Sequence, residues 1–202
     1  MAILRRVRAR ISKSRVPDAF DLEHRVETAK EVSLFQLDVS SPHESAGFGY
    51  QPSPVEVCNE LFSSLPIRHQ DFTFIDVGAG KGRVLLVASG FPFKRLIGVE
   101  FARELVDLAL ENMERAGCRA EVVHVDAAEY SFPLDNLIIY LYNPFGAEIL
   151  RRVLASLQRI GEHREVYLLY LNPKNDSCVR EFAHEMYQRA GAKVYHFGQK
   201  GK

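Results

Sequence analysis

The stretch Thr73-Phe-Ile-Asp-Val-Gly-Ala-Gly-Lys-Gly-Arg83 decides the fold. Its first half, residues 73–77, is rich in apolar and β-forming residues, which predicts a buried strand. Three glycines follow on alternate positions, and residues 83–89 (RVLLVAS) then have the composition of a helix. A strand, a glycine-rich turn and a helix form the first βα unit of a doubly wound α/β fold, whose ligands bind at the carboxyl ends of the strands.

The turn differs from two phosphate-binding motifs that also follow such a strand. The dinucleotide motif G-x-G-x-x-G has a third glycine where this chain has Arg83, and the P-loop pattern G-x-x-x-x-G-K-[ST] is absent from residues 78–84. Asp76 stands two positions before the first glycine. Its carboxylate repels a pyrophosphate and suits a ligand that carries an ammonium group and a sulfonium centre.

Acidic residues also follow the next two predicted strands. Residues 95–100 (RLIGVE) form the second strand, which ends on Glu100. In α/β nucleotide sites an acid at about this distance from the first strand accepts hydrogen bonds from the ribose hydroxyls. The third strand, residues 120–125, is followed by Asp126. The carboxyl ends of parallel strands meet at one edge of a sheet, so we expect the three acids to lie close together.

The second half of the chain continues the alternation of strands and helices. Residues 136–142 (NLIIYLY) are apolar and predict a central strand, and residues 165–171 predict a fifth. Residues 176–190 predict a helix and residues 193–197 a sixth strand, after which no room is left for a seventh. The predicted fold is therefore a doubly wound, Rossmann-like, mostly parallel sheet with an abbreviated C-terminal edge.

The run Asp76-Val-Gly-Ala-Gly-Lys-Gly82 resembles motif I of the class I S-adenosylmethionine-dependent methyltransferases. The resemblance covers about residues 48–198 and includes the strand end Gly98-Val-Glu100 and the run Tyr140–Phe145. It implies S-adenosyl-L-methionine as cofactor and S-adenosyl-L-homocysteine as product. The cofactor-binding residues that it implies are Asp76, Gly78, Ala79, Gly80, Gly82, Glu100, Phe101, Asp126, Ala127 and Asn143.

Asn143, Pro144 and Phe145 resemble the [Asp/Asn]-Pro-Pro-[Tyr/Phe] motif of enzymes that methylate a nitrogen, with one proline missing. The resemblance implies that the Asn143 side-chain oxygen orients an acceptor amine on which Phe145 stacks. Tyr50 lies before the first strand, in a segment that forms a wall of the substrate site in several methyltransferase groups. We expect N-methylation of a protein side chain or a small molecule, and a weaker likeness points to small protein-lysine methyltransferases.

Composition limits the partners. The chain has 202 residues, with 26 lysines and arginines against 26 aspartates and glutamates, so net charge favours neither nucleic acid nor a membrane. Three scattered cysteines and the lack of a run of about 20 apolar residues predict a cytoplasmic protein. No residue cluster predicts a metal site. A DNA acceptor is disfavoured because DNA methyltransferases generally need a recognition domain or large insertions.

The predicted organisation is a basic N-terminal arm and cap over the site, residues 1–52, followed by the methyltransferase domain, residues 53–202. Five arginines and Lys13 precede the first acid, which allows an RNA or membrane contact. Ser53 is expected to cap the helix that Pro54 begins, with Glu56 completing the capping box. Two alternatives stay open: a non-catalytic S-adenosylmethionine-binding module that acts through a partner, and a dinucleotide-dependent oxidoreductase.

Overall fold

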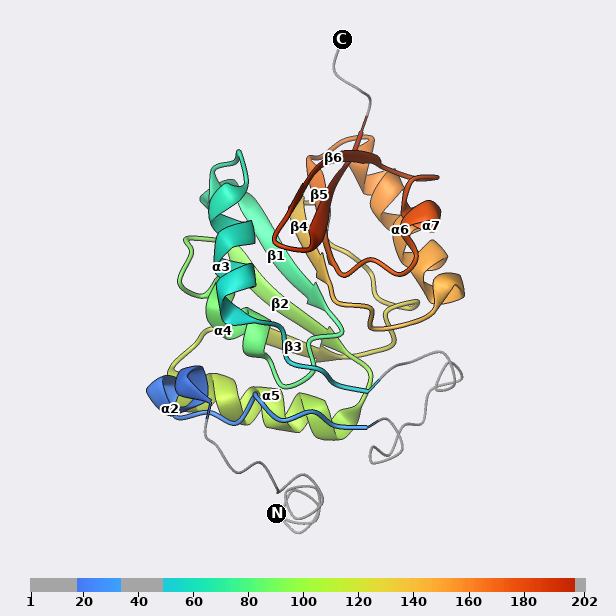
Figure 1. Ribbon diagram of the computed structural model, residues 1–202. Helices are drawn as coiled ribbons and strands as arrows, with labels where there is room; N and C mark the ends of the chain where they lie inside the picture. Colours follow the sequence, from blue (N-terminus) through green and yellow to red (C-terminus); the bar gives the residue numbers. More distant parts are fainter. Residues whose placement is uncertain (1–17, 34–48, 199–202) are drawn as a thin grey trace.

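A computed structural model describes residues 18–33 and 49–198, and a seven-stranded sheet runs through its centre (Figure 1). The strand order is β3-β2-β1-β4-β5-β7-β6. Five strands are parallel, and β7 runs antiparallel to both β5 and β6. The strands are β1 (Phe72–Val77), β2 (Arg95–Glu100), β3 (Glu121–His124), β4 (Asn136–Leu141), β5 (Val166–Leu171), β6 (His184–Arg189) and β7 (Ala192–Phe197). The predicted doubly wound, mostly parallel α/β fold is confirmed.

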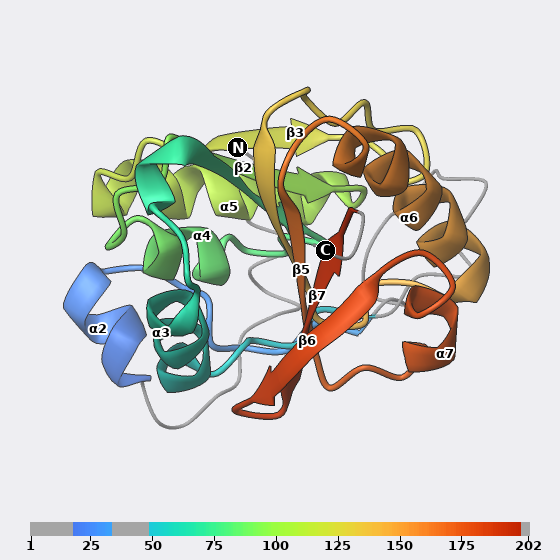
Figure 2. The same ribbon diagram turned by 90° about the horizontal axis from the view of Figure 1, so that it is seen from above.

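Helices cover both faces of this sheet, as the view from above shows (Figure 2). In the described part of the chain they are α2 (Ala19–His24), α3 (Val55–Ser64), α4 (Arg83–Ala88), α5 (Arg103–Ala116), α6 (Ala147–Gly161) and α7 (Asp176–Val179), with a 3-10 turn at His69–Asp71. None of the helices in the described ranges is long and apolar enough to cross a membrane.

Alternate residues of the central strands supply two separate cores. In β1, Ile75 and Val77 pack in the core that α6 and α7 cover, whereas Phe72 and Phe74 pack in the core that α3 and α4 cover. A strand sends successive side chains to opposite faces, so a strand buried on both faces is apolar throughout. This is why the sequence of β4 reads as one unbroken apolar run.

The predicted abbreviated edge is wrong. Residues 184–189 form the edge strand β6 where a helix was expected, so the sheet has its full seven strands. Ala190 and Gly191 both have positive φ, 51° and 78°, and they connect β6 to β7 as a tight hairpin turn. An edge strand has one partner and little buried surface, so its side chains are mainly polar and show no clear alternation.

The predicted N-terminal cap of α3 is also wrong. The helix begins at Val55, and Pro54 occupies the cap position with no side-chain hydrogen bond to the helix. Ser53 turns its hydroxyl toward β4 instead, where it accepts a hydrogen bond from the Tyr140 hydroxyl at 2.9 Å. This link ties the segment before α3 to the centre of the sheet.

The predicted division into an arm (residues 1–52) and a domain (residues 53–202) stays a prediction. Residues 18–33 of that arm lie beside α4 and α5, and Val32 pairs with Tyr50 in an isolated antiparallel bridge (Figure 1). The basic residues 1–17 lie outside the described residues.

Candidate active site

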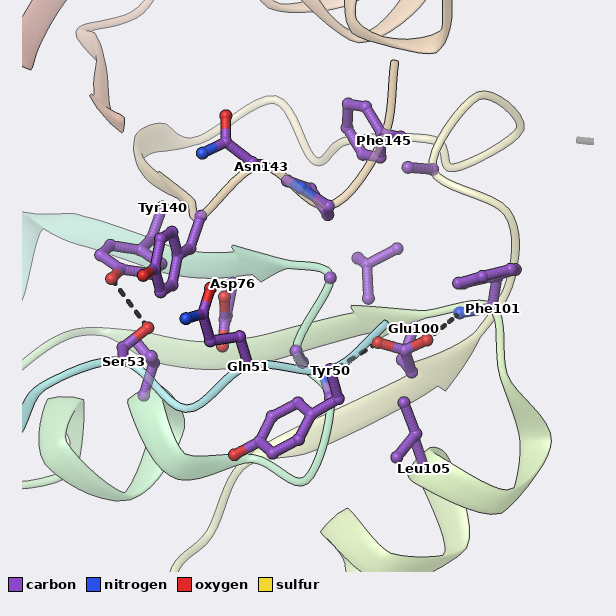
Figure 3. Close-up of a pocket in the computed structure, with 18 of the residues that line it drawn as sticks. Tyr50, Gln51, Ser53, Asp76, Glu100, Phe101, Leu105, Tyr140, Asn143 and Phe145 are labelled. Carbon is purple, nitrogen blue, oxygen red and sulfur yellow. Dashed lines mark hydrogen bonds between the residues drawn. The ribbon is translucent and has the colours of Figure 1, made fainter. Parts of the chain in front are cut away.

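A pocket lies at the carboxyl ends of β1, β2 and β4 (Figure 3). Three chain segments close it: the loop before α3, the turn between β1 and α4, and the loop after β4. The predicted site residues that line it are Tyr50, Asp76, Gly78, Ala79, Gly80, Glu100, Phe101, Asp126, Ala127, Asn143, Pro144 and Phe145. Gly82 is not among the lining residues, because it lies one turn away, against Met113 of α5.

The glycine-rich turn is held close to three other segments. The backbone N–H groups of Gly78 and Ala79 donate to the Val99 carbonyl, at 2.8 and 3.1 Å. A Cβ on Gly78 would lie 2.4 Å from Cβ of Pro144, and one on Gly80 would lie 2.1 Å from the Tyr50 ring. Both glycines also have positive φ, 85° and 54°. Only glycine satisfies the backbone conformation and the close approach together.

Glu100 connects this turn to the end of β2. One carboxylate oxygen accepts from the Gly80 N–H at 2.8 Å, and the other accepts from the N–H groups of Phe101 and Ala102, each at 3.0 Å. The side chain is buried, and burial raises the pKa of this carboxyl, against the lowering effect of the three hydrogen bonds. The carboxylate is therefore fixed in place with lone pairs still available on the pocket side.

Asp76 is a buried carboxyl of a different kind. It is 3% exposed, and among the described residues no group donates a hydrogen bond to its side chain. Burial, with a smaller contribution from the negative charge of Glu100, raises its pKa to about 8. A buried carboxylate that lacks a partner and faces a pocket favours a cationic ligand.

The third acid, Asp126, also lines the pocket. Asp126 follows β3, and its carboxylate accepts from the Ala128 N–H at 2.8 Å. Phe101 and Leu105 line the same part of the pocket with apolar surface. Apolar surface together with a carboxylate suits a planar ring that bears an amino group.

Residues 50–53, here called the wall, close one side of the pocket. The Tyr50 hydroxyl donates to the Thr28 carbonyl at 2.6 Å, and its ring lies over Gly80. Gln51 lines the pocket, and Ser53 accepts from Tyr140 of β4. The sequence predicts Tyr50 as a wall residue but not the part played by Ser53, because a serine before a proline resembles a helix cap.

Asn143 lines the pocket with φ of +46°, but its amide is turned toward the loop after β5. Its Oδ1 accepts from the Tyr170 hydroxyl at 2.8 Å and from the Lys174 N–H at 3.2 Å, while Nδ2 donates to the Asn172 carbonyl at 2.7 Å. Figure 3 shows this amide pointing away from Glu100. The neighbouring Pro144 and Phe145 lie against the pocket.

Comparison with known proteins agrees with this geometry. A family model described as "Methyltransferase domain" matches residues 74–161. The matched residues are therefore a methyltransferase domain, and the fold is that of the class I S-adenosylmethionine-dependent methyltransferases. A protein-lysine N-methyltransferase of Saccharolobus islandicus is 32% identical over 77 residues, which are 37% of this chain and 47% of that protein. The match thus spans about half the length of this curated relative.

Solved structures share the fold of the methyltransferase domain. A SAM-dependent methyltransferase from Aquifex aeolicus superposes with a TM-score of 0.55 at 13% identity, covering 72% of this chain and 94% of that one. An RNA methyltransferase from Salinibacter ruber, in complex with S-adenosyl-L-homocysteine, gives 0.50 at 18% identity, covering 75% and 96%. At such identities the likeness extends to the fold.

The cofactor of the methyltransferase domain is S-adenosyl-L-methionine, and the described residues fit it. The cofactor carries an ammonium group and a sulfonium centre, and the pocket presents the unpaired carboxyl of Asp76. Because Gly78 and Gly80 have no side chains, the backbone of the turn is open to a bound ligand.

We expect Gly80→Ala to weaken cofactor binding strongly while the protein stays folded. The added methyl group collides with the Tyr50 ring, so the wall must move, and affinity for S-adenosylhomocysteine falls on the order of 100-fold. Gly117→Ala is the matched control, because Gly117 also has positive φ (64°) but has nothing within 4 Å of the new atom. Calorimetric titration of both variants makes the comparison. Equal binding by the two would contradict the assigned position of the wall.

The raised pKa of Asp76 predicts a pH-dependent affinity. In the unliganded fold this carboxyl holds its proton up to about pH 8, so stability falls as pH rises from about 4 through 8. A cationic ligand favours the ionised form, so affinity for S-adenosylhomocysteine rises between pH 6 and 7.5, by up to about tenfold per pH unit. Asp76→Asn removes the titrating group and flattens the profile. Calorimetry at several pH values measures the affinity of the wild type and of Asp76→Asn. The same pH dependence in both proteins would rule out Asp76 as the titrating group.

Proposed function

We propose that this chain transfers a methyl group from S-adenosylmethionine to an amine nitrogen, with a protein lysine side chain as the acceptor class and a small-molecule amine as the second choice. The charge of the pocket carries the proposal. Among the described lining residues, Asp76, Glu100 and Asp126 are acidic, whereas Arg83 is the one cation and is paired with Asp18 and Asp21 outside the pocket. Such a pocket favours a cationic cofactor and an acceptor that binds as an ammonium ion.

In the proposed binding mode each acid has one task. Glu100 accepts hydrogen bonds from the ribose hydroxyls, as acids at the end of a second strand do. Asp76 faces the ammonium group of the cofactor. Asp126, with Ala127 and Phe101, holds the adenine ring. The turn from Gly78 to Gly80 brings the backbone close to the aminoacyl part.

The acceptor end of the pocket is aromatic. Tyr140, Tyr142 and Phe145 line it around the Asn143-Pro144 turn. Aromatic faces attract ammonium ions, and they hold a methylated amine as well as an unmethylated one. A hydroxyl or a carboxylate acceptor gains less from this surface than an amine does.

The chemistry needs little from acidic or basic side chains. The cofactor supplies an electrophilic methyl carbon bound to a sulfonium. The amine loses a proton to solvent, its lone pair forms the nitrogen–carbon bond as the carbon–sulfur bond breaks, and the methylated product carries the positive charge. Tyr50, Phe145 and the turn at Pro144 orient the amine and exclude water, so catalysis comes mainly from proximity and alignment.

The resemblance of the curated relative supports the lysine acceptor, since that protein is a protein-lysine N-methyltransferase. Arg83 at the third glycine position and Asp76 beside the turn disfavour the dinucleotide alternative. A non-catalytic module and an RNA or membrane contact through the basic arm depend on residues 1–17, outside the described residues.

We expect label to pass from S-adenosylmethionine with a radioactive methyl group to lysine-containing peptides. The same peptides acetylated on lysine are the control, because acetylation removes the nucleophilic lone pair. Transfer to small amines alone would favour the second acceptor class. Binding of S-adenosylhomocysteine without transfer to any nitrogen would contradict catalysis on amines and point to the non-catalytic module.

Asn143 allows a sharper test. We expect Asn143→Ala to lose turnover by about tenfold or more while S-adenosylhomocysteine still binds, because the amide holds the loops after β4 and β5 together. Tyr170→Phe removes one donor from Asn143 Oδ1 and frees a lone pair. If that oxygen receives the amine directly, Tyr170→Phe retains or gains activity. A loss in both variants indicates a positioning role, and full activity of Asn143→Ala would remove Asn143 from the mechanism.

A further inference from the structure

Arg83 is the first residue of α4 and replaces the third glycine of a dinucleotide motif, yet its guanidinium is almost completely buried. It makes five hydrogen bonds to protein atoms, as many as it has N–H groups. All five go to Asp18, Asp21, Thr28 and Ser53. Although Arg83 lines the pocket, it has no donor left for a cofactor. Its role is therefore to hold the two chain segments that it contacts.

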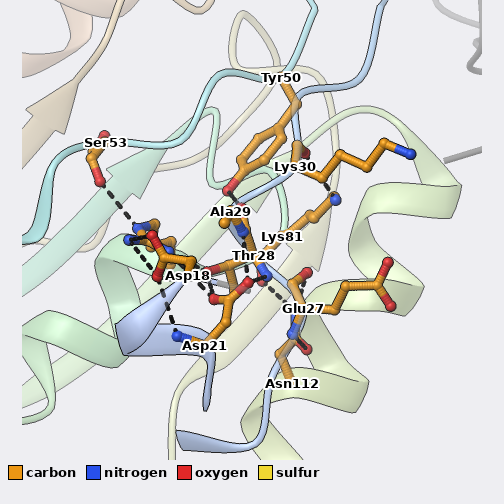
Figure 4. Close-up of polar contacts among 11 residues, drawn as sticks. Asp18, Asp21, Glu27, Thr28, Ala29, Lys30, Tyr50, Ser53, Lys81 and Asn112 are labelled. Atoms are coloured by element: carbon orange, nitrogen blue, oxygen red, sulfur yellow. Dashed lines mark hydrogen bonds and ion pairs between the residues drawn. The ribbon is translucent and has the colours of Figure 1, made fainter. Parts of the chain in front are cut away.

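The first of these segments is the strap, residues 18–33, which lies beside α4 and α5 (Figure 4). Arg83 pairs with both carboxylate oxygens of Asp18 at 3.1 Å and with Asp21 at 3.2 Å. It also donates to the Thr28 hydroxyl at 2.8 Å. Asp21 in turn accepts from the Thr28 N–H at 2.7 Å. The guanidinium therefore fixes the fold of the strap from its first residue to Thr28.

The strap fixes Tyr50. The Thr28 carbonyl accepts the Tyr50 hydroxyl at 2.6 Å, and the Val32 N–H donates to the Tyr50 carbonyl at 3.0 Å. The buried ammonium of Lys81 donates to the Lys30 carbonyl at 2.9 Å and lies 5.4 Å from the centre of the Tyr50 ring. Tyr50 is thus held at its hydroxyl, at its backbone carbonyl and by the cation beside its ring, which covers Gly80.

Arg83 also holds the other end of the wall directly. Its Nε donates to the Ser53 carbonyl at 3.1 Å. Ser53 then accepts from Tyr140, which lines the acceptor end of the pocket. A single buried cation consequently holds both ends of the wall. It holds Tyr50 through Thr28, and it holds Ser53 directly.

We propose that Arg83 is a positioning residue of this methyltransferase, which sets the wall at residues 50–53 against the glycine-rich turn by fixing Thr28 and Ser53. The strap is then part of the cofactor site, although it does not line the pocket. The proposal rests on the cofactor site assigned above and does not depend on which acceptor is methylated.

The test is a double-mutant cycle of Arg83→Gln and Tyr50→Phe, read as the dissociation constant of S-adenosylhomocysteine by calorimetry. Tyr50→Phe removes only the bond to the Thr28 carbonyl, and we expect it to weaken binding by about tenfold, as for one lost hydrogen bond. Arg83→Gln should weaken binding at least as much. Because both act through the position of the same ring, the double variant should bind no more weakly than Arg83→Gln alone.

The control is Arg152→Gln, which removes an exposed arginine paired with Glu148 on α6 and should bind as the wild type does. If Arg83→Gln does not fold, Thr28→Val replaces it in the cycle, since it removes the hydroxyl that Arg83 contacts but keeps the carbonyl that Tyr50 contacts. The proposal would be overturned if the fold-losses in affinity of the two substitutions multiply in the double variant. Wild-type affinity in Arg83→Gln would also overturn it. A wild-type protein that binds the product but methylates no amine contradicts only the proposed acceptor.

Steady-state kinetics give a second readout. A displaced wall raises KM for S-adenosylmethionine more than it lowers kcat, because the cofactor must spend binding energy on reordering the wall. Restoring the charge with Arg83→Lys should recover the ion pairs with Asp18 and Asp21 but not the fork that reaches Ser53 and Thr28 together. A Lys variant with full affinity would show that charge alone is enough and would overturn the positioning role.

Discussion

The burial of two carboxyl groups on adjacent strands is the constraint on which the site depends. Glu100 and Asp76 are 4% and 3% exposed at the carboxyl ends of β2 and β1. Glu100 is compensated by three backbone N–H groups, from Gly80 and from the start of the segment that leads into α5. These bonds hold the glycine-rich turn in register with β2. Asp76 has no such compensation, which leaves the pocket with a preference for positive charge.

Much of this arrangement could be predicted from the sequence, because it depends on local patterns. Strands buried on both faces, such as β1 and β4, consist mainly of apolar residues, and α5 and α6 have clear helical periodicity. Once the order of strands is known, a parallel sheet necessarily brings their carboxyl ends to one edge. The acids after the first three strands could therefore be placed in one pocket without any knowledge of side-chain contacts.

The remaining features depend on contacts between distant residues or on weak patterns. The partners of Arg83 lie 30 to 65 positions away. The sequence therefore shows that Arg83 replaces a motif glycine, but not that its buried side chain connects several segments. The amide of Asn143 is engaged by residues up to 31 positions away. The sequence of strand β6 predicts a helix, because an edge strand buries little surface and its polar side chains give no period of two. Ser53 has the sequence context of a helix cap, but its hydroxyl accepts a hydrogen bond from the Tyr140 hydroxyl instead of from the helix.

Several positions that break local rules lie in or beside the pocket. Gly78, Gly80, Asn143 and Asn172 all have positive φ at strand ends, and Asp76 is buried with no hydrogen bond from the described residues. Each feature costs folding free energy, and the cost is offset by well-packed cores on both faces of the sheet. A ligand that binds only the folded protein returns part of that free energy. In the binding mode proposed here, a cation that neutralises Asp76 would also stabilise the turn beside it and so couple occupancy of the pocket to the order of the wall and strap.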